Sequence, residues 1–296
     1  MNSNKYSLPS LTLIFYLCTN LLISTLKMPT KKISTHSYSC PCQYCDAFAT
    51  LIQQWLDSGF ICPSSSSFAS PSFIVPKKDP NAIPRWVCDY CQLNANTIPD
   101  NYPLPHITEI LADCGKGKIW SIIDMTDSFF QTCIHPDDIH KTMITKPLGA
   151  YEWCIMPMGL CNSPPIHQRR MLTILQKHIG KLCHVYMDDI IIWSENLDDH
   201  IKHVQIILQT LQEAGLYINK NKMSLFFNYK IAFLGHIISQ SGIMANPSKV
   251  QKILDWPTPT NLKEVQQFLG LVKYLNAFLP HLAIQISILS SLTTKE

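Results

Sequence analysis

Charged residues are scarce in this chain of 296 residues: Asp, Glu, Lys and Arg make up 15% of it. An average soluble domain has about 25%, so the composition argues against long disordered tails and coiled coils. The net charge of +3 is too small to indicate a nucleic-acid-binding protein by itself, and any such binding must come from local clusters. With 46% hydrophobic residues the chain can bury a large core, which predicts one large domain or two closely packed ones.

The spacing of the twelve cysteines gives little support to a zinc site. Two Cys-x-x-Cys pairs occur, one inside the cluster 40–45 and one formed by Cys88 and Cys91. A structural zinc site usually takes two such pairs from one small module, and the second pair falls in a predicted strand. A metal at 40–45, with His36 nearby, stays open as the alternative. Single cysteines beside apolar residues favour reduced thiols in an intracellular protein.

The apolar stretch 8–26 has nearly the length of a membrane span and also resembles a signal peptide. A proline near its start and the polar pair 19–20 in its middle weaken both interpretations. We expect residues 1–45 to be an N-terminal extension that is poorly ordered or has no role in the fold, with membrane insertion as the alternative.

From Asp46 onward the hydrophobic spacing predicts alternating helices and hairpins. The expected elements are a helix 46–59, strands 72–75 and 85–90 around a turn, a strand 119–124, a hairpin of 142–145 with 151–156, a helix 163–180, an apolar run 183–193, a helix 197–215, a strand pair ending at 239, and helices starting at 246 and 261. This order favours an α+β fold with helices on one face of a sheet.

Three acidic residues interrupt apolar strands. Asp188 and Asp189 lie in the middle of the run 183–193, and Asp124 ends an apolar strand. Two adjacent carboxylates repel each other and are costly to desolvate, so a bound cation is the favoured explanation; a solvated acidic turn is the alternative. If the strand ends meet across a sheet, the carboxylates suit two Mg²⁺ ions that activate a 3′-hydroxyl and stabilise a leaving pyrophosphate.

Nucleotidyl transfer also needs cations that hold a triphosphate. Lys77, Lys78 and Arg85 on the first predicted hairpin could supply them, Arg as a planar fork and Lys as point charges. Two lysines at a hairpin tip alone indicate only a solvated turn. They become informative because the three acids accompany them.

The sequence Tyr-Met-Asp-Asp at 186–189, between apolar strands, resembles the signature of retroviral and LTR-retrotransposon reverse transcriptases. Further segments resemble the family's motifs in the same order along the chain. They are the fingers segment 73–105, the two palm motifs 123–131 and 156–168, the primer-grip hairpin 233–236, and the segment 255–271 typical of Gypsy-type elements. The chain is therefore similar, from about residue 46 to about residue 282, to the reverse transcriptase of a Gypsy-type Pol polyprotein.

The resemblance implies a right-hand polymerase, with fingers and an antiparallel palm within 46–240 and a partial helical thumb within 241–296. It implies an RNA-directed DNA polymerase that transfers dNTPs to a primer 3′-hydroxyl with two Mg²⁺ ions, for which Mn²⁺ can substitute. The implied partners are an RNA or DNA template, a DNA or tRNA primer and dNTPs. The implied location is intracellular, in the cytoplasm, a virus-like particle or the nucleus.

The resemblance also assigns roles to single residues. Catalysis and metal binding would fall to Asp124, Asp188 and Asp189. Contacts with the incoming nucleotide would come from Lys77, Arg85, the backbone N–H groups of Asp127 and Ser128, Phe129, which would exclude a 2′-hydroxyl, Met158 and Gly159. Signature and primer contacts would come from Tyr186, Met187, Gln168, Phe233, Leu234, Gly235 and His236. Without the motif, Phe129 would be an ordinary core residue.

Two departures from the family's pattern keep a second hypothesis open. Cys91 and Cys133 stand where the family often has arginine, and only three of the 24 basic residues are arginine. Arg-to-Cys takes one C-to-T change, so we hypothesise an element copy altered by cytosine deamination. A gene without an excess of such changes relative to sister copies would refute this. Neutral thiols would remove phosphate contacts, and the alternative function is a catalytically silent, nucleic-acid-binding remnant.

No Asp-Thr/Ser-Gly triplet typical of the family's protease occurs in the sequence, and the length beyond the thumb is too short for a ribonuclease H fold. We therefore expect a fragment of the polyprotein that lacks its other Pol modules.

Overall fold

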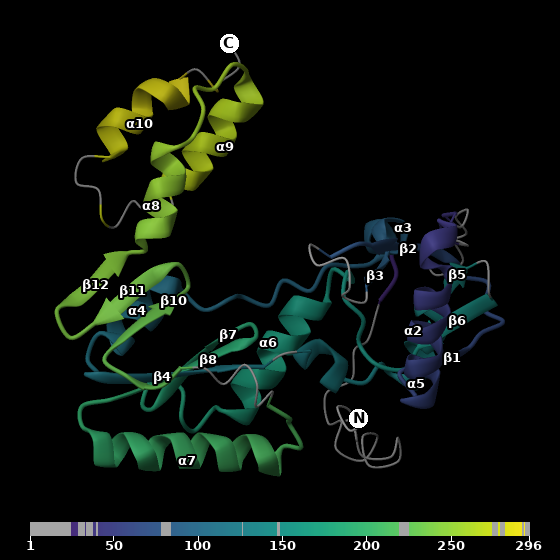
Figure 1. Ribbon diagram of the computed structural model, residues 1–296, viewed down its shortest axis with the longest axis horizontal. Coiled ribbons are helices and arrows are strands. Elements are labelled where there is room, and N and C mark those ends of the chain that lie inside the picture. Colours follow the sequence, from purple (N-terminus) through teal and green to yellow (C-terminus); the bar gives the residue numbers. More distant parts are fainter. Residues whose placement is uncertain are drawn as a thin grey trace.

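The computed structural model describes residues 25–28, 33, 38–39, 41–77, 84–125, 127–146, 149–218, 225–273, 278, 282–291 and 293. These residues form an elongated molecule with the fingers at one end, the palm at the other, and a helical thumb segment above the palm (Figure 1). The expected right-hand α+β architecture is confirmed. The stretch 8–26, apart from its last two residues, and Lys78 lie outside the described residues. No helix within the described ranges is long and apolar enough to cross a membrane.

The fingers combine short helices with a sheet in the strand order β1-β6-β5-β2-β3. β2 pairs with β5 in parallel, whereas the other neighbours are antiparallel, and both expected hairpins, β2 with β3 and β5 with β6, are present. The elements are η1 (Cys42–Tyr44), α2 (Cys45–Asp57), β1 (Ile61–Pro63), β2 (Ser70–Val75), β3 (Arg85–Cys88), α3 (Cys91–Asn96), α5 (Pro136–Ile139), η3 (His140–Thr142), β5 (Ile144–Lys146) and β6 (Gly149–Trp153).

Aromatic rings join the fingers to the palm. Trp55 of α2 stacks on Trp86 of β3 with ring centroids 4.6 Å apart and lies 4.8 Å from Trp153 of β6. Phe130, from the first palm motif, stacks on Trp153 at 5.7 Å. Each such ring pair contributes about 0.5–1.5 kcal/mol beyond the burial of its surface. The cluster therefore fixes β3, and with it Arg85, relative to the palm.

The palm sheet has the order β7-β8-β4-β9 and is antiparallel throughout. It is followed along the chain by a separate three-stranded sheet, β10-β11-β12, and by three helices of the described thumb segment. The elements are α4 (Ile107–Cys114), β4 (Ile119–Asp124), η2 (Ser128–Gln131), α6 (Ser163–Ile174), β7 (Cys183–Tyr186), β8 (Asp189–Ser194), α7 (Leu197–Glu213), β9 (Leu225–Asn228), β10 (Lys230–Phe233), β11 (His236–Ser239), β12 (Gly242–Ala245), α8 (Pro247–Leu254), α9 (Leu262–Lys273) and α10 (Leu282–Ser291).

Both faces of the palm sheet are covered, although the sequence predicted helices on one face only. Ile190 and Ile192 of β8 pack with residues of α6 and α7. Ile191 and Trp193 pack on the opposite face with residues of α4, β10 and β11. A strand buried on both faces is apolar at successive positions rather than at alternate ones, which accounts for the continuous apolar run.

Two boundaries differ from expectation. The expected division at residue 240 cuts through the three-stranded sheet, because β12 pairs with β11, and the helical segment begins only at α8. α6 ends at Ile174 instead of near Gly180, since Leu175 leaves helical geometry (φ −95°, ψ 9°) and turns follow. The expected helix starts at 246 and 261 are confirmed, and both are capped: Asn246 accepts from the Ser248 N–H and Asn261 from the Glu264 N–H, both at 3.0 Å.

A buried network of hydroxyl and imidazole groups attaches α7 to the palm sheet. His200, which is 0% exposed, bonds Ser121 of β4 through Nε2 and Ser194 of β8 through Nδ1, both at 2.8 Å. Ser194 also bonds Nδ1 of His203 at 2.7 Å. Burial, reinforced by His203, lowers the pKa of His200 to about 4, so the network is built around a neutral ring at pH 7.

The free energy of unfolding should therefore fall as the pH drops from about 6.5 towards about 4. In that range the unfolded chain binds a proton at His200 that the folded chain excludes, so acid favours unfolding. At about 1.4 kcal/mol per pKa unit, the loss from this residue is on the order of 3 kcal/mol. Urea unfolding near neutral pH and near pH 4.5 should show a smaller loss for His200→Gln than for wild type. The exposed His106→Gln serves as control, and an equal pH response of the His200 and His106 variants would contradict the expectation.

Candidate active site

The three acidic residues meet at one end of the palm sheet. In the register of β4 against β8, Asp124 pairs with Asp189. Tyr186 of β7 lies opposite the same Asp189, which leaves a two-residue turn that contains Asp188. The turn is joined to the end of β4 because the Met125 N–H donates to the Asp188 carbonyl at 2.9 Å. The strand ends therefore meet, as the sequence argument required.

The turn between β7 and β8 has an unusual backbone. Met187 has φ 55°, in the left-handed region that residues other than glycine adopt at a cost of about 1–2 kcal/mol. The Met187 N–H donates to Gln168 Oε1 at 2.7 Å, and Gln168 Nε2 donates to the Val185 carbonyl at 3.0 Å. Gln168 is 0% exposed, so its contact is with the signature turn itself.

The environment of the carboxylates disfavours their negative charge. Burial raises the pKa of Asp189, and the nearby charges of Asp124 and Asp188 raise it further. Burial also raises the pKa of Asp188. A hydrogen bond from Ser128 lowers this pKa, and the nearby charge of Asp124 raises it. A cation held by these carboxylates would offset this penalty, because it would stabilise their ionised forms.

The donor set fits a hard cation. All three side chains offer carboxylate oxygens, the ligands that Mg²⁺ prefers. Within the part of the chain that the structure describes, no three His, Cys, Asp or Glu side chains form a preformed metal cage. Mg²⁺ usually keeps several waters and takes one or two carboxylates together with substrate phosphates. The residues therefore fit a site that a bound triphosphate completes.

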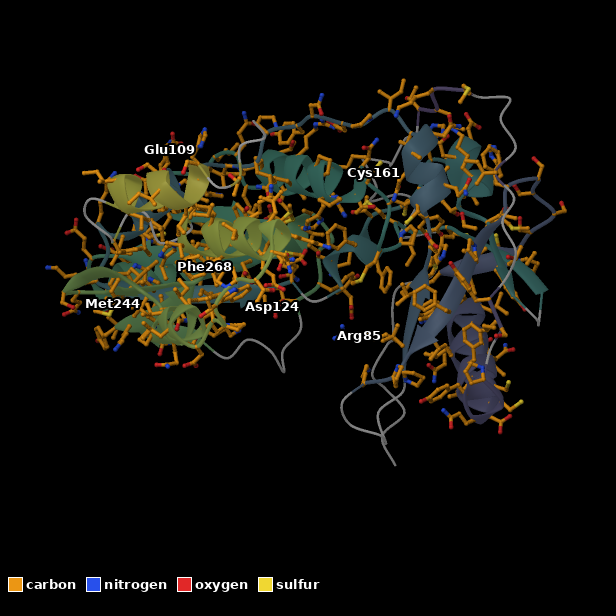
Figure 2. All side chains as sticks on the ribbon, turned by 90° about the horizontal axis from the view of Figure 1, so that it is seen from above. Arg85, Glu109, Asp124, Cys161, Met244 and Phe268 are labelled. Carbon is orange, nitrogen blue, oxygen red and sulfur yellow. The ribbon has the colours of Figure 1, made fainter. Side chains whose placement is uncertain are left out.

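The expected triphosphate-binding cations lie on the fingers. Arg85 is exposed at the start of β3, where it pairs with Val75 of β2. Figure 2 shows its side chain pointing from the fingers towards the palm, on the side where Asp124 lies. Lys77 is also exposed, just beyond the end of β2.

The loop expected to line the nascent base pair is braced by the fingers. Met158 is 58% exposed, and Gly159 has φ +99°, where a Cβ would lie 3.3 Å from the Cys88 carbonyl. The amide of Asn94 in α3 donates to the Gly159 carbonyl at 2.8 Å and accepts from the Cys161 N–H at 2.9 Å. Sequence reasoning included Asn94 in a motif but missed this contact.

The first palm motif turns sharply after β4. Asp127 has φ 58° and precedes η2, and the Ser128 N–H donates to the Met125 carbonyl at 3.1 Å. The ring of Phe129 lies 5.0 Å from that of His167, a residue of α6 that sequence reasoning did not single out. The triphosphate contacts of Asp127 and Ser128 stay a prediction, as does the steric role of Phe129.

The expected primer-grip residues form the turn between β10 and β11. Leu234 and Gly235 have φ 45° and 76°, and positive φ at both central residues is typical of a two-residue hairpin with a type I′ turn. Phe233 and His236 pair on either side of the turn and are buried. Their contact with a primer stays a prediction.

The two departures from the family's pattern differ in their surroundings. Cys91 is exposed at the start of α3. Cys133 is 1% exposed and its backbone forms an isolated β-bridge with Ile155, so its side chain lies in the core. The loss of a template contact at these two positions stays a prediction. Cys42 and Cys45 are exposed and form no disulfide with a described residue.

Comparison with known proteins decides the family. The family model described as "Reverse transcriptase (RNA-dependent DNA polymerase)" matches residues 75–238. The chain belongs to the reverse transcriptase family. This reverse transcriptase domain is 40% identical over 264 residues to the Pol polyprotein of the Drosophila melanogaster transposon opus, which covers 88% of this chain and 26% of that protein. It is 38% identical over 236 residues to that of the transposon gypsy in the same organism, covering 78% and 23%.

The reverse transcriptase domain thus spans about a quarter of the length of these curated relatives. Among solved structures, a foamy viral protease-reverse transcriptase with double-stranded DNA has a TM-score of 0.78 and 27% identity, covering 93% of this chain and 49% of that one. A second, with an RNA/DNA hybrid, has a TM-score of 0.74 and 26% identity, covering 97% and 40%. The Gypsy-type resemblance is confirmed, and the silent-remnant alternative is not favoured.

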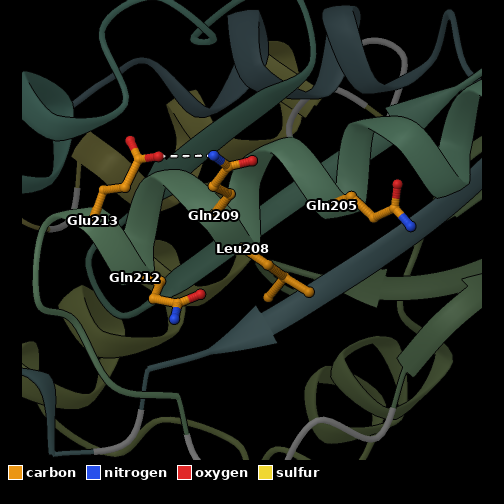
Figure 3. Close-up of a pocket in the computed structure, with 5 residues that line it drawn as sticks. All are labelled: Gln205, Leu208, Gln209, Gln212 and Glu213. Atoms are coloured by element: carbon orange, nitrogen blue, oxygen red, sulfur yellow. Dashed lines mark hydrogen bonds between the residues drawn. The ribbon is translucent and has the colours of Figure 1, made fainter.

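A hollow on the surface of α7 is separate from this site. The residues that line it all come from one helix, and they are Gln205, Leu208, Gln209, Gln212 and Glu213 (Figure 3). Gln209 donates to Glu213 at 2.8 Å, which satisfies the one carboxylate present. No described residue outside α7 lines the hollow, so we assign it no part in the chemistry of the reverse transcriptase domain.

Replacing Gln168 by Met should weaken both the turn and the activity. The Met187 N–H and the Val185 carbonyl lose their partner in a buried site, which costs about 1–3 kcal/mol in the free energy of unfolding. Urea unfolding measures that loss, and primer extension should fall because Asp188 shares the turn. Gln176→Met, at an exposed position, is the matched control. Equal stability of the two variants would show that the Gln168 amide does not support the turn.

Proposed function

We propose that this reverse transcriptase domain is an RNA-directed DNA polymerase that transfers dNTPs to the 3′-hydroxyl of a primer. The observation that carries the proposal is the strand register in which Asp124 faces Asp189 and Asp188 lies in the adjoining turn. Three carboxylates that repel one another at the end of a sheet are suited to a reaction in which divalent cations and phosphates come together.

Asp124, Asp188 and Asp189 would hold two divalent ions, Mg²⁺ or Mn²⁺. Such ions, when bound, neutralise phosphoryl charge and favour ionisation of the attacking hydroxyl. Arg85 and Lys77 bind and orient the triphosphate from the fingers. The aromatic cluster keeps β3 in place for this task, because it ties the strand to the palm.

The proposed partners are an RNA or DNA template, a DNA or tRNA primer, and dNTPs. The foamy viral relatives are described with double-stranded DNA and with an RNA/DNA hybrid, which supports nucleic-acid binding by this chain. Lys252 on α8 and Lys263 on α9 are exposed on the thumb segment and supply cations for backbone phosphates. The proposed location is intracellular, where template and dNTPs are found.

Asp188→Asn should abolish nucleotide incorporation, because loss of one metal ligand leaves phosphoryl charge without compensation. The assay is primer extension on an RNA template with Mg²⁺ or Mn²⁺, using the full chain. Asp198→Asn makes the same chemical change at an exposed position of α7 and should leave extension unchanged. Extension by Asp188→Asn at the wild-type rate would refute the metal assignment, and no extension by folded wild type would refute the polymerase proposal.

Phe129→Val should admit ribonucleotides, because a smaller side chain under the sugar leaves room for a 2′-hydroxyl. The measurement is the ratio of kcat/KM for a dNTP and its matching rNTP. Phe60→Val removes a ring from the fingers cluster instead, and it should leave the ratio unchanged even if the rate falls. A ratio unaltered in Phe129→Val would mean that the ring serves only the core.

A further inference from the structure

One oxygen of the Asp188 carboxylate is engaged by the protein and the other is not. Oδ1 accepts a hydrogen bond from Ser128 Oγ at 2.5 Å, and Nε2 of His167 lies 3.5 Å from the same Oδ1. The described residues donate no hydrogen bond to Oδ2. The Asp188 side chain is 43% exposed, so the carboxylate borders both the protein interior and solvent.

His167 is a buried polar side chain whose position needs an explanation. It is 0% exposed, and neither ring nitrogen forms a hydrogen bond with any described residue. A buried polar group without a partner costs about 1–3 kcal/mol. The polar atom that Nε2 faces is Oδ1 of Asp188.

The chemistry of the two groups is complementary. An ionised carboxylate only accepts hydrogen bonds, and an imidazole with a hydrogen on Nε2 is a donor that suits Oδ1. Ser128 approaches this oxygen from η2 and His167 approaches it from α6. The hydrogen bond from Ser128 and the close approach of His167 to the same oxygen limit rotation of the carboxylate and leave Oδ2 for another ligand.

We propose that Ser128 and His167 are positioning residues that hold the Asp188 carboxylate by Oδ1 and so present Oδ2 to a divalent cation. The inference rests on the proposed function, in which Asp188 is a cation ligand. Groups that orient a ligand typically contribute roughly 10–100-fold to metal affinity. These residues therefore set the affinity for the cation, while the maximal rate at a filled site depends on the carboxylates themselves.

Mn²⁺ binding to the full chain, followed by electron paramagnetic resonance of the free ion, tests this without turnover. Ser128→Ala and His167→Phe should each weaken Mn²⁺ binding by about tenfold. His167→Gln keeps an N–H donor and should bind within about threefold of wild type, on the same scale. Ser194→Ala removes a buried hydroxyl from the same sheet, at the His200 network, and should bind Mn²⁺ as wild type does.

Primer extension at varied Mg²⁺ separates positioning from a general loss of structure. In Ser128→Ala the Mg²⁺ concentration for half-maximal rate should rise about tenfold, while saturating Mg²⁺ restores the maximal rate. A maximal rate lost at every Mg²⁺ concentration would overturn positioning in favour of a structural role.

The two proposals fail in different ways. Wild-type Mn²⁺ affinity in both Ser128→Ala and His167→Phe, with binding lost in Asp188→Asn, would overturn the positioning role and leave the proposed function standing. Undiminished Mn²⁺ binding by Asp188→Asn would overturn the proposed metal ligand itself, and the positioning role with it.

Discussion

Repulsion among three carboxylates held at the end of an antiparallel sheet is the constraint on which the rest of the palm depends. Asp124 and Asp189 face each other in register, and Asp188 lies in the adjoining turn between β7 and β8. Isolated carboxylates in such a place would be destabilising. The sheet holds them in place because both of its faces are packed, with α6 and α7 on one side and α4 with the β10–β11 hairpin on the other.

The same constraint explains why polar side chains gather around the signature turn. Gln168 satisfies the backbone of a strained Met187, and Ser128 donates to Asp188. His167 lies beside that carboxylate, and its ring is 5.0 Å from the ring of Phe129. Motif residues such as Gln168 and Ser128, and His167, which had no expected role, therefore form one assembly. In it the backbone of Met187, the orientation of the Asp188 carboxylate and the position of the Phe129 ring depend on one another.

A second assembly links this site to the fingers. Trp55, Trp86 and Trp153 join three elements of the fingers, and Phe130 attaches them to the palm motif that ends with η2. Arg85 precedes Trp86 in β3, so packing of an aromatic cluster determines where the guanidinium stands relative to the carboxylates. The position of an exposed cation is thus fixed by the packing of the neighbouring ring, Trp86, on the same strand.

The sequence alone determined the family, the order of the motifs and most local structure. Two-residue periodicity, turn residues and caps act over a few positions, so the hairpins, the caps at Asn246 and Asn261, and the acids at strand ends could be predicted. Only the tertiary structure decided what residues distant in the chain do together: the burial of Cys133, the covering of the second sheet face, and the approach of His167 to Asp188. These depend on how helices and strands pack, and no local pattern of residues records that packing.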